Sequence, residues 1–192
     1  CSPAENAELF AATIGGLGLT GVITTVTLRM RRIASAYIDA EKLAYGSLDA
    51  FFELNAESEG RFEHLVAWFD CTAGAANLGR GIFSRGNWSP FGDLEPHRDA
   101  GLLQLPVELP SFTINPLSLR LINAVYRANE TRALGAHRLH YGPFFHPLDT
   151  VRGWSRIYGS AGMYQYQCVL PVPTAAAATH ALLAQIAKSG EG

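Results

Sequence analysis

The sequence has too little positive charge and too few cysteines for several common classes of protein. Lys and Arg together number 15 among 192 residues, and the net charge is −2, so the clustered phosphate contacts of a nucleic-acid-binding protein are not indicated. Three cysteines without a CxxC pair predict neither a disulfide framework nor a zinc site. We therefore expect a cytoplasmic protein that binds no nucleic acid and no metal.

Long hydrophobic runs are also missing. No apolar stretch approaches the roughly 20 residues that a transmembrane helix needs. Hydrophobic residues nevertheless make up 48% of the chain, which is enough to bury a core, so a folded domain is predicted rather than a disordered chain. The sequence starts at Cys1 within a helix signal and stops at Gly192 just after another helix signal. We therefore expect it to be a piece of a longer protein.

A glycine-rich turn, GLGLTG at 16–21, follows the first predicted helix at about 3–14. Its letters match the GxGxxG dinucleotide fingerprint, but that motif needs a strand before it and a helix after it. Here the order is reversed, because 22–33 alternates like a strand, and a Rossmann site is rejected. Two interpretations remain: a plain tight turn, or a turn whose missing side chains let the backbone approach a flat cofactor.

The middle of the chain mixes strands and helices. Alternation predicts strands at about 36–44, 61–71 and 80–88, of which the last two form an antiparallel pair. Ser47 is expected to cap a helix, and Pro116 is expected to open another helix with a buried apolar stripe. These elements predict an α+β fold, a largely antiparallel sheet with helices packed on one face.

Two side chains on the predicted strand at 61–71 allow a structural or a functional interpretation. His64 has no second histidine at metal-ligand spacing, so a metal role is not expected for it. Trp68 is typical of a sheet core, but its indole can also form a flat wall for a sugar or a lipid head group.

The region at 89–115 is too long and too rich in proline for an ordinary connection. Its leucines make it apolar for a solvated linker. We expect it to be mobile and to cover a groove or contact a membrane or partner, the alternative being that it packs on its own domain.

The stretch FFHPLDTVRGWSRIYGSAGMYQYQCVLP at 144–171 organises the rest of the chain. It predicts a loop, a short helix capped by Asp149 and a strand at 163–170. The period of two places Gln165 and Gln167 on one face of that strand. The two amides either face water or form a ligand face, because a glutamine amide offers donors and an acceptor to the hydroxyls of a sugar.

Several parts of the sequence carry a resemblance to a known family. CSPAENAELFAATIGGLGLTGVITTVTLRMRRI resembles the last part of the flavin-binding domain of FAD-linked oxidases of the vanillyl-alcohol oxidase superfamily. AWFD, LGRGIFSRG, FFHPLD and above all YGSAGMYQYQCVLP resemble the members of that superfamily that act in cell-wall arabinan synthesis. The resemblance covers nearly the whole chain and is weakest at 89–115.

The resemblance implies two domains and two sets of site residues. Residues 1–33 would be the C-terminal end of an FAD-binding domain, and 34–192 a substrate-binding domain that is incomplete at its C-terminus. Positions near FAD would be Gly16, Gly18, Gly21 and Ile23. Positions lining the substrate pocket would be Trp68, Phe145, Gln165 and Gln167. The family has tyrosine where Phe145 stands, so the orientation or identity of the sugar is in question.

The resemblance also implies a reaction, which is oxidation of a hydroxyl of a lipid-linked, decaprenylphosphoryl-ribose-like sugar by hydride transfer to FAD. Implied partners are an NAD-dependent short-chain reductase acting on the keto product, and a membrane contacted peripherally through 89–115. Lys42 and Lys188 do not match the catalytic lysine of the family, so the chain alone is expected to be inactive. It is also expected to carry no FAD, because it offers only one wall of the cofactor and none of the contacts to its diphosphate. Two alternatives stay open: a non-catalytic glycolipid-binding module, and an FAD oxidase of another alcohol such as a sugar lactone.

Overall fold

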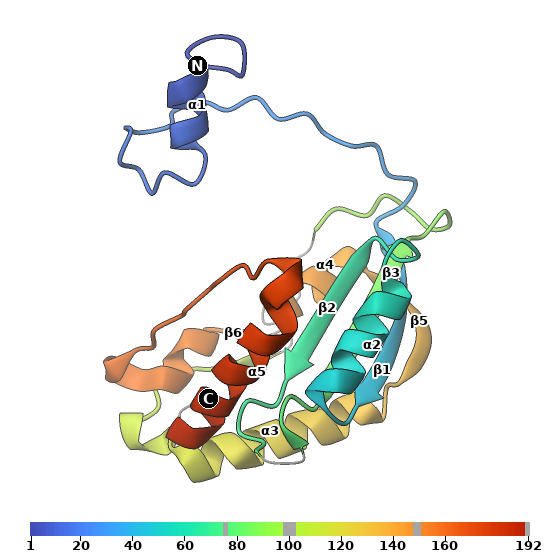
Figure 1. Ribbon diagram of the computed structural model, residues 1–192, viewed down its shortest axis with the longest axis vertical. Helices are drawn as coiled ribbons and strands as arrows, with labels where there is room; N and C mark the ends of the chain where they lie inside the picture. Colours follow the sequence, from blue (N-terminus) through green and yellow to red (C-terminus); the bar gives the residue numbers. More distant parts are fainter. Residues whose placement is uncertain (75–76, 98–102, 148–150, 191–192) are drawn as a thin grey trace. The chain divides into compact units, whose positions relative to one another are not determined.

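The computed structural model describes residues 1–74, 77–97, 103–147 and 151–190 (Figure 1). The chain divides into two compact units, Cys1–Arg32 and Ile33–Gly192. Assignment of the first unit to a flavin-binding domain stays a prediction.

The first unit contains one short helix, α1 (Ala7–Thr13), followed by turns. The Ser2 hydroxyl oxygen accepts the backbone N–H of Glu5 at 3.0 Å, as a helix cap would. The helix nevertheless begins only at Ala7, because Asn6 adopts a left-handed conformation with φ of 55° and separates that turn from the helix.

The strand predicted at 22–33 is wrong. No described strand pairs with this segment. Its apolar side chains are 65–91% exposed, namely Val22, Val26, Leu28 and Met30. Alternation reports only a local preference, whereas a strand also needs a neighbour for its backbone N–H and C=O groups.

The second unit is built on a four-stranded antiparallel sheet with the order β2-β3-β1-β5 (Figure 1). Its strands are β1 (Tyr37–Tyr45), β2 (His64–Phe69), β3 (Gly81–Trp88) and β5 (Gly135–His140). The predicted α+β class with a largely antiparallel sheet is confirmed. The sequence did not predict β5, because GAHRLH contains only one large apolar residue.

Among its described residues, four α-helices and several short elements complete this unit. The helices are α2 (Leu48–Ser58), α3 (Pro116–Thr131), α4 (Tyr141–Phe145) and α5 (Val172–Ser189). Two 3-10 helices, η2 (Ser111–Thr113) and η4 (Trp154–Ala161), lie near a parallel pair of short strands, β4 (Leu103–Gln104) and β6 (Val151–Arg152). Within the described part of the chain, no helix is both long and apolar enough to cross a bilayer.

The helices contact both faces of the sheet rather than the single face expected. Phe51 of α2 lies against Phe83 of β3, with ring centroids 5.9 Å apart. Tyr126 of α3 lies 4.8 Å from Trp68 of β2. Phe83 is paired in register with Ala67, the residue before Trp68, and successive side chains of a strand point to opposite faces. The helices α2 and α3 therefore lie on opposite faces.

The apolar stripe of α3 is exposed, although the sequence predicted it to be buried. Leu117, Leu121 and Val125 are 77%, 65% and 52% exposed. The helix itself begins at Pro116 as predicted, with Asn115 as its cap. Helical spacing therefore predicted the element correctly but not its environment.

The predicted order of helix and strand after residue 147 is also wrong. Asp149, the expected cap, lies outside the described residues. The expected helix is replaced by β6 and η4, and 163–171 forms neither helix nor strand. Tyr164, Tyr166 and Val169 are at least 80% exposed. No described strand pairs with this segment, so its alternation lacks the partner that a strand needs.

Part of the proline-rich region is fixed within its own unit. The guanidinium of Arg156 in η4 donates to the carbonyl oxygens of Leu105 at 2.6 Å and Pro106 at 3.0 Å. The backbone N–H of Leu109 donates to the carbonyl oxygen of Arg156 at 2.9 Å. These bonds favour packing on its own domain for 105–109.

Candidate functional site

One face of the sheet carries a row of β2 side chains between α4 and α3. His64, Val66 and Trp68 share this face because they alternate along β2. At one end, the ring of His64 lies 4.9 Å from that of Phe145 in α4. At the other end Trp68 lies 4.8 Å from Tyr126 in α3, and between them Val66 is 39% exposed. We call these five residues the Trp68 face.

The helix α4 is held on the sheet by Phe144, which is 7% exposed and belongs to a core cluster with Ile38 and Ala40. The next residue, Phe145, is 36% exposed. Its ring contacts those of His64 and Trp88, at 4.9 and 6.2 Å between centroids. One turn of helix therefore buries one aromatic ring and leaves the next at the surface beside β2.

An ion pair accompanies Tyr126 at the α3 end of the Trp68 face. Lys42 Nζ lies 2.6 Å from Glu130 Oε2, and both side chains are largely buried. Burial raises the pKa of the Tyr126 phenol, and the negative charge of Glu130 raises it further. Tyr126 is therefore a neutral phenol at neutral pH, able to donate one hydrogen bond and to accept others.

Asp70, just beyond β2, fixes α3 against this end of the sheet. Its carboxylate is 1% exposed and accepts from Arg80 Nε and Nη2 at 3.0 and 2.7 Å, and from Thr72 Oγ1 at 2.7 Å. It also accepts from Asn123 Nδ2 of α3 at 3.1 Å. Burial alone would raise the pKa of Asp70, but the hydrogen bonds from Thr72, Arg80 and Asn123 outweigh burial and hold that pKa below its ordinary value.

Acid should weaken this anchor. Because the pKa of Asp70 is lower in the folded state than in the unfolded state, its contribution to stability is complete above the unfolded-state pKa, near 3.9. The contribution is lost as the pH falls through the folded-state pKa. Urea unfolding at pH 7 and at pH 3 should show a smaller loss of stability for Asp70→Asn than for the wild type. Equal losses in the two proteins would contradict the assignment.

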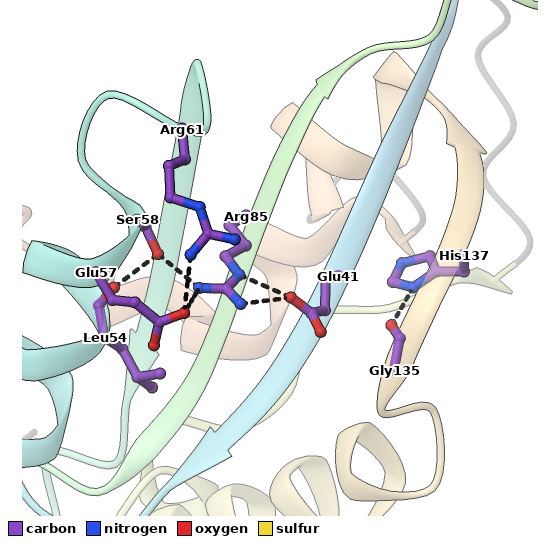
Figure 2. A network of polar contacts seen from close by, with 8 residues as sticks. All are labelled: Glu41, Leu54, Glu57, Ser58, Arg61, Arg85, Gly135 and His137. Atoms are coloured by element: carbon purple, nitrogen blue, oxygen red, sulfur yellow. Dashed lines mark hydrogen bonds and ion pairs between the residues drawn. The ribbon is translucent and has the colours of Figure 1, made fainter.

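The opposite face of the sheet carries a polar network around Arg85 (Figure 2). Arg85 is 7% exposed, and its guanidinium lies 2.7 Å from the Glu41 carboxylate. Its Nη1 also donates to Glu57 at 3.2 Å and to Ser58 at 3.0 Å, both in α2. These contacts join α2 to β3 and β1, so we assign Arg85 a structural role rather than a role in binding.

The structure brings together only some of the residues predicted to line a substrate pocket. Trp68 and Phe145 share the Trp68 face. Gln165 and Gln167 lie in the exposed segment 163–171, and neither side chain hydrogen-bonds to a described residue. Sequence reasoning placed His64 on a strand without a metal role and Tyr126 in a buried helical stripe, and assigned neither to the substrate pocket. No local signal shows that these two rings flank the predicted pair.

The glycine turn of the first unit offers open backbone. Gly18 and Gly21 have φ of +79° and +132°, which favours glycine, and a Cβ at either position would meet nothing within 4 Å. A Cβ at Gly16 would overlap the carbonyl oxygen of Ala12, so this glycine has a packing role. Ile23 is 63% exposed. Bare backbone beside an exposed apolar side chain fits a flat ring system such as a flavin.

Comparison with known proteins identifies relatives of the chain. No family model matches it. In an alignment of 176 positions that covers 86% of its length, the chain is 36% identical to decaprenylphosphoryl-beta-D-ribose oxidase of Mycolicibacterium smegmatis. It is 33% identical over 86 residues to a protein of the mprA 5′ region of Streptomyces coelicolor. It is 40% identical over 67 residues to an oxidoreductase, ORF5, of the fasciation locus of Rhodococcoides fascians.

The matches cover 86%, 45% and 34% of the chain. They span 38%, 23% and 15% of the lengths of the three relatives. The resemblance identified in the sequence is confirmed by the first of them. Over 86% of its length, the chain is therefore similar to part of decaprenylphosphoryl-beta-D-ribose oxidase.

Proposed function

We propose that the chain is part of an FAD-dependent oxidoreductase that oxidises a hydroxyl of a lipid-linked sugar. The observation that carries this proposal is the 36% identity, over 86% of the chain, to an enzyme named as the oxidase of decaprenylphosphoryl-beta-D-ribose. The relative from Rhodococcoides fascians, named as an oxidoreductase, supports the class of reaction. The proposal concerns the whole enzyme, because the match spans 38% of that oxidase.

We assign substrate contact to the Trp68 face. Partly exposed aromatic rings and Val66 offer a flat apolar surface to the C–H face of a sugar and to the start of a lipid chain. The neutral phenol of Tyr126 offers a hydrogen bond to a sugar hydroxyl. Two lines of reasoning support this assignment. One is the exposed aromatic surface of the Trp68 face, and the other is the family resemblance, which implies Trp68 and Phe145 as substrate-binding positions.

FAD is the proposed cofactor, and the chain's contribution to holding it is the turn at 16–21 together with Ile23. Accepting hydride from the sugar carbon is the chemistry that FAD supplies when bound. Gly18 and Gly21 would let the backbone approach the ring system, because no side chain stands between them. Ile23 would pack its exposed side chain against the ring.

Two further predictions concern partners. The keto sugar produced would be consumed by an NAD-dependent short-chain reductase. Contact with the membrane that holds a lipid-linked substrate would involve the described parts of 89–115, where Phe91, Leu94, Val107 and Phe112 are 63–78% exposed.

A turnover assay separates the proposal from its alternatives. We expect purified FAD-containing enzyme to convert decaprenylphosphoryl-β-D-ribose to a keto sugar and to leave a sugar lactone unchanged. Oxidation of the lactone alone would favour the oxidase of another alcohol. Binding of decaprenylphosphoryl-β-D-ribose without any product, in protein that carries no FAD, would favour the glycolipid-binding module.

Replacing Trp68 by alanine should raise the KM for decaprenylphosphoryl-β-D-ribose about tenfold. The indole is partly exposed, so a bound sugar would bury only part of the apolar area whose full burial contributes about 1.5–3 kcal/mol. Steady-state kinetics of the enzyme measures the effect. Trp154→Ala is the matched control, because Trp154 lies in η4 and packs on Tyr158. An equal KM in both variants would remove Trp68 from the site.

A further inference from the structure

We propose that His140 positions Phe145 on the Trp68 face by capping α4, and that it does so only while its imidazole is neutral. Acid would then release one wall of the substrate site. The consequence for substrate rests on the proposed function, whereas the cap and its response to acid do not.

The two ring nitrogens of His140 have separate partners. Nδ1 accepts the backbone N–H of Gly142 at 3.2 Å, which makes His140 the cap of α4. Nε2 lies 3.3 Å from the backbone carbonyl oxygen of Glu95. A carbonyl oxygen only accepts and an N–H only donates, so Nε2 must carry the hydrogen and Nδ1 must be bare. The pair of bonds therefore requires one tautomer of the neutral imidazole.

Besides the burial of Phe144, the position of α4 depends on a few such hydrogen bonds. The helix has five residues, Tyr141–Phe145, and a single helical turn is not stable by itself. Its start is tied by the Tyr141 N–H to the carbonyl oxygen of Ala36 at 2.9 Å and by the His140 cap. Loosening the cap should therefore displace the ring of Phe145, which is partly exposed and close to the end of the helix.

Protonation would turn the cap into a repulsive contact. A proton on Nδ1 would place an N–H opposite the N–H of Gly142, and two donors cannot bond. A second imidazole stands close by, because a Cβ on Gly142 would lie 3.3 Å from Nδ1 of His140 and 3.4 Å from Nδ1 of His97. Since histidines change charge between about pH 8 and pH 5, a charged His97 would add to the repulsion.

Among the residues that the structure describes, no carboxylate forms an ion pair with His140 that would offset this effect. The rings of Tyr37 in β1 and Tyr141 in α4 lie 5.8 and 4.4 Å from that of His140, and neither side chain is a carboxylate. His146 lies 6.2 Å from His97 and, if charged, adds positive charge. On the same sheet face, the Asp39 carboxylate is paired with Arg138 at 2.6 Å.

Two substitutions separate capping from titration. In His140→Asn, the short amide can accept the N–H of Gly142, as asparagine caps do, but it does not titrate. In His140→Ala, the cap is lost at every pH. His180→Asn is the control, because His180 is an exposed histidine of α5.

The first readout needs no substrate. In NMR spectra of the chain between pH 8 and pH 5, the amide of Gly142 should shift together with the His140 imidazole and lose protection from hydrogen exchange. His140→Asn should keep a protected amide throughout, His140→Ala should lack protection throughout, and His180→Asn should behave like the wild type. A Gly142 amide that stays protected while His140 takes up its proton would overturn the proposal.

The second readout is the KM for decaprenylphosphoryl-β-D-ribose in the FAD-containing enzyme. Between pH 8 and pH 5, the KM of the wild type should rise about threefold to thirtyfold more than the KM of His140→Asn. This factor corresponds to the loss of a helix N-cap. His140→Ala should show the raised KM already at pH 8, with kcat little changed. An equal rise in wild type and His140→Asn would show that His140 is not the group responsible. If no variant, wild type included, oxidises the sugar, the proposed function fails, and the Gly142 amide still decides the role of His140.

Discussion

Replacing Asp70 by alanine should lower the free energy of unfolding of the second unit by about 3 kcal/mol, the lower end of the loss for a broken buried ion pair, because the Arg80 side chain that loses its partner is 30% exposed. The carboxylate is 1% exposed, and Arg80, Thr72 and Asn123 all donate to it. Without it, the guanidinium of Arg80 and the amide of Asn123 lose their partner, and α3 loses an anchor to the end of β2. Urea unfolding followed by circular dichroism at pH 7 measures the loss.

Glu53→Ala is the matched control for that experiment. Glu53 is an exposed carboxylate on α2, and surface substitutions usually change stability by no more than about 0.5 kcal/mol. An Asp70→Ala variant as stable as Glu53→Ala would show that the network around Asp70 does not hold α3 in place.

Replacing Gln167 by alanine should lower kcat/KM for decaprenylphosphoryl-β-D-ribose about tenfold to a hundredfold in the FAD-containing enzyme. A lost hydrogen bond costs about 0.5–1.5 kcal/mol net, and an unpaired buried partner costs about 1–3 kcal/mol. The structure leaves Gln167 exposed, so this expectation rests on the family resemblance. Steady-state kinetics, flavin content and melting temperature should be measured together, and only kcat/KM should change.

Gln104→Ala provides the comparison, because Gln104 is an exposed glutamine of β4. If Gln167→Ala and Gln104→Ala both stay within about twofold of the wild type, Gln167 faces water and is no ligand. A fall in melting temperature for Gln167→Ala would instead mean that this glutamine belongs to the core.

Local signals predicted the elements that local chemistry determines. The hydroxyl oxygen of Ser47 accepts the N–H of Ala50 at 3.3 Å, as the cap predicted for α2 should. Pro116 opens α3, as predicted. Alternation also predicted β1, β2 and β3. These predictions are correct because each strand has a neighbouring strand to which its backbone can hydrogen-bond.

Alternation failed where no partner was present. Segments 22–33 and 163–170 alternate as clearly as β1 does, yet neither is paired with a described strand. Conversely, the short helix α4 contains Pro143 and has no helical stripe. It forms because proline is tolerated in the first turn, because Phe144 is buried in the core and because His140 caps it. Two of these causes are tertiary contacts that the local sequence does not reveal.

The Trp68 face was predictable only in part, because some of its contacts are tertiary contacts that the local sequence does not reveal. The period of β2 places His64, Val66 and Trp68 on one face, and the family resemblance identified Trp68 and Phe145. The contact between Trp68 and Tyr126 joins residues 58 positions apart, and no spacing rule predicts it. The pairing of His64 with Phe145 depends likewise on the fold.

The most direct measurement is the absorbance of enzyme-bound flavin after anaerobic mixing with decaprenylphosphoryl-β-D-ribose. Hydride transfer from the sugar should bleach the flavin band in wild-type enzyme, and Trp68→Ala should need about tenfold more sugar for half the maximal rate. A flavin band that stays unchanged at saturating decaprenylphosphoryl-β-D-ribose, in enzyme shown by titration to bind that sugar, would contradict oxidation of a lipid-linked sugar by this enzyme.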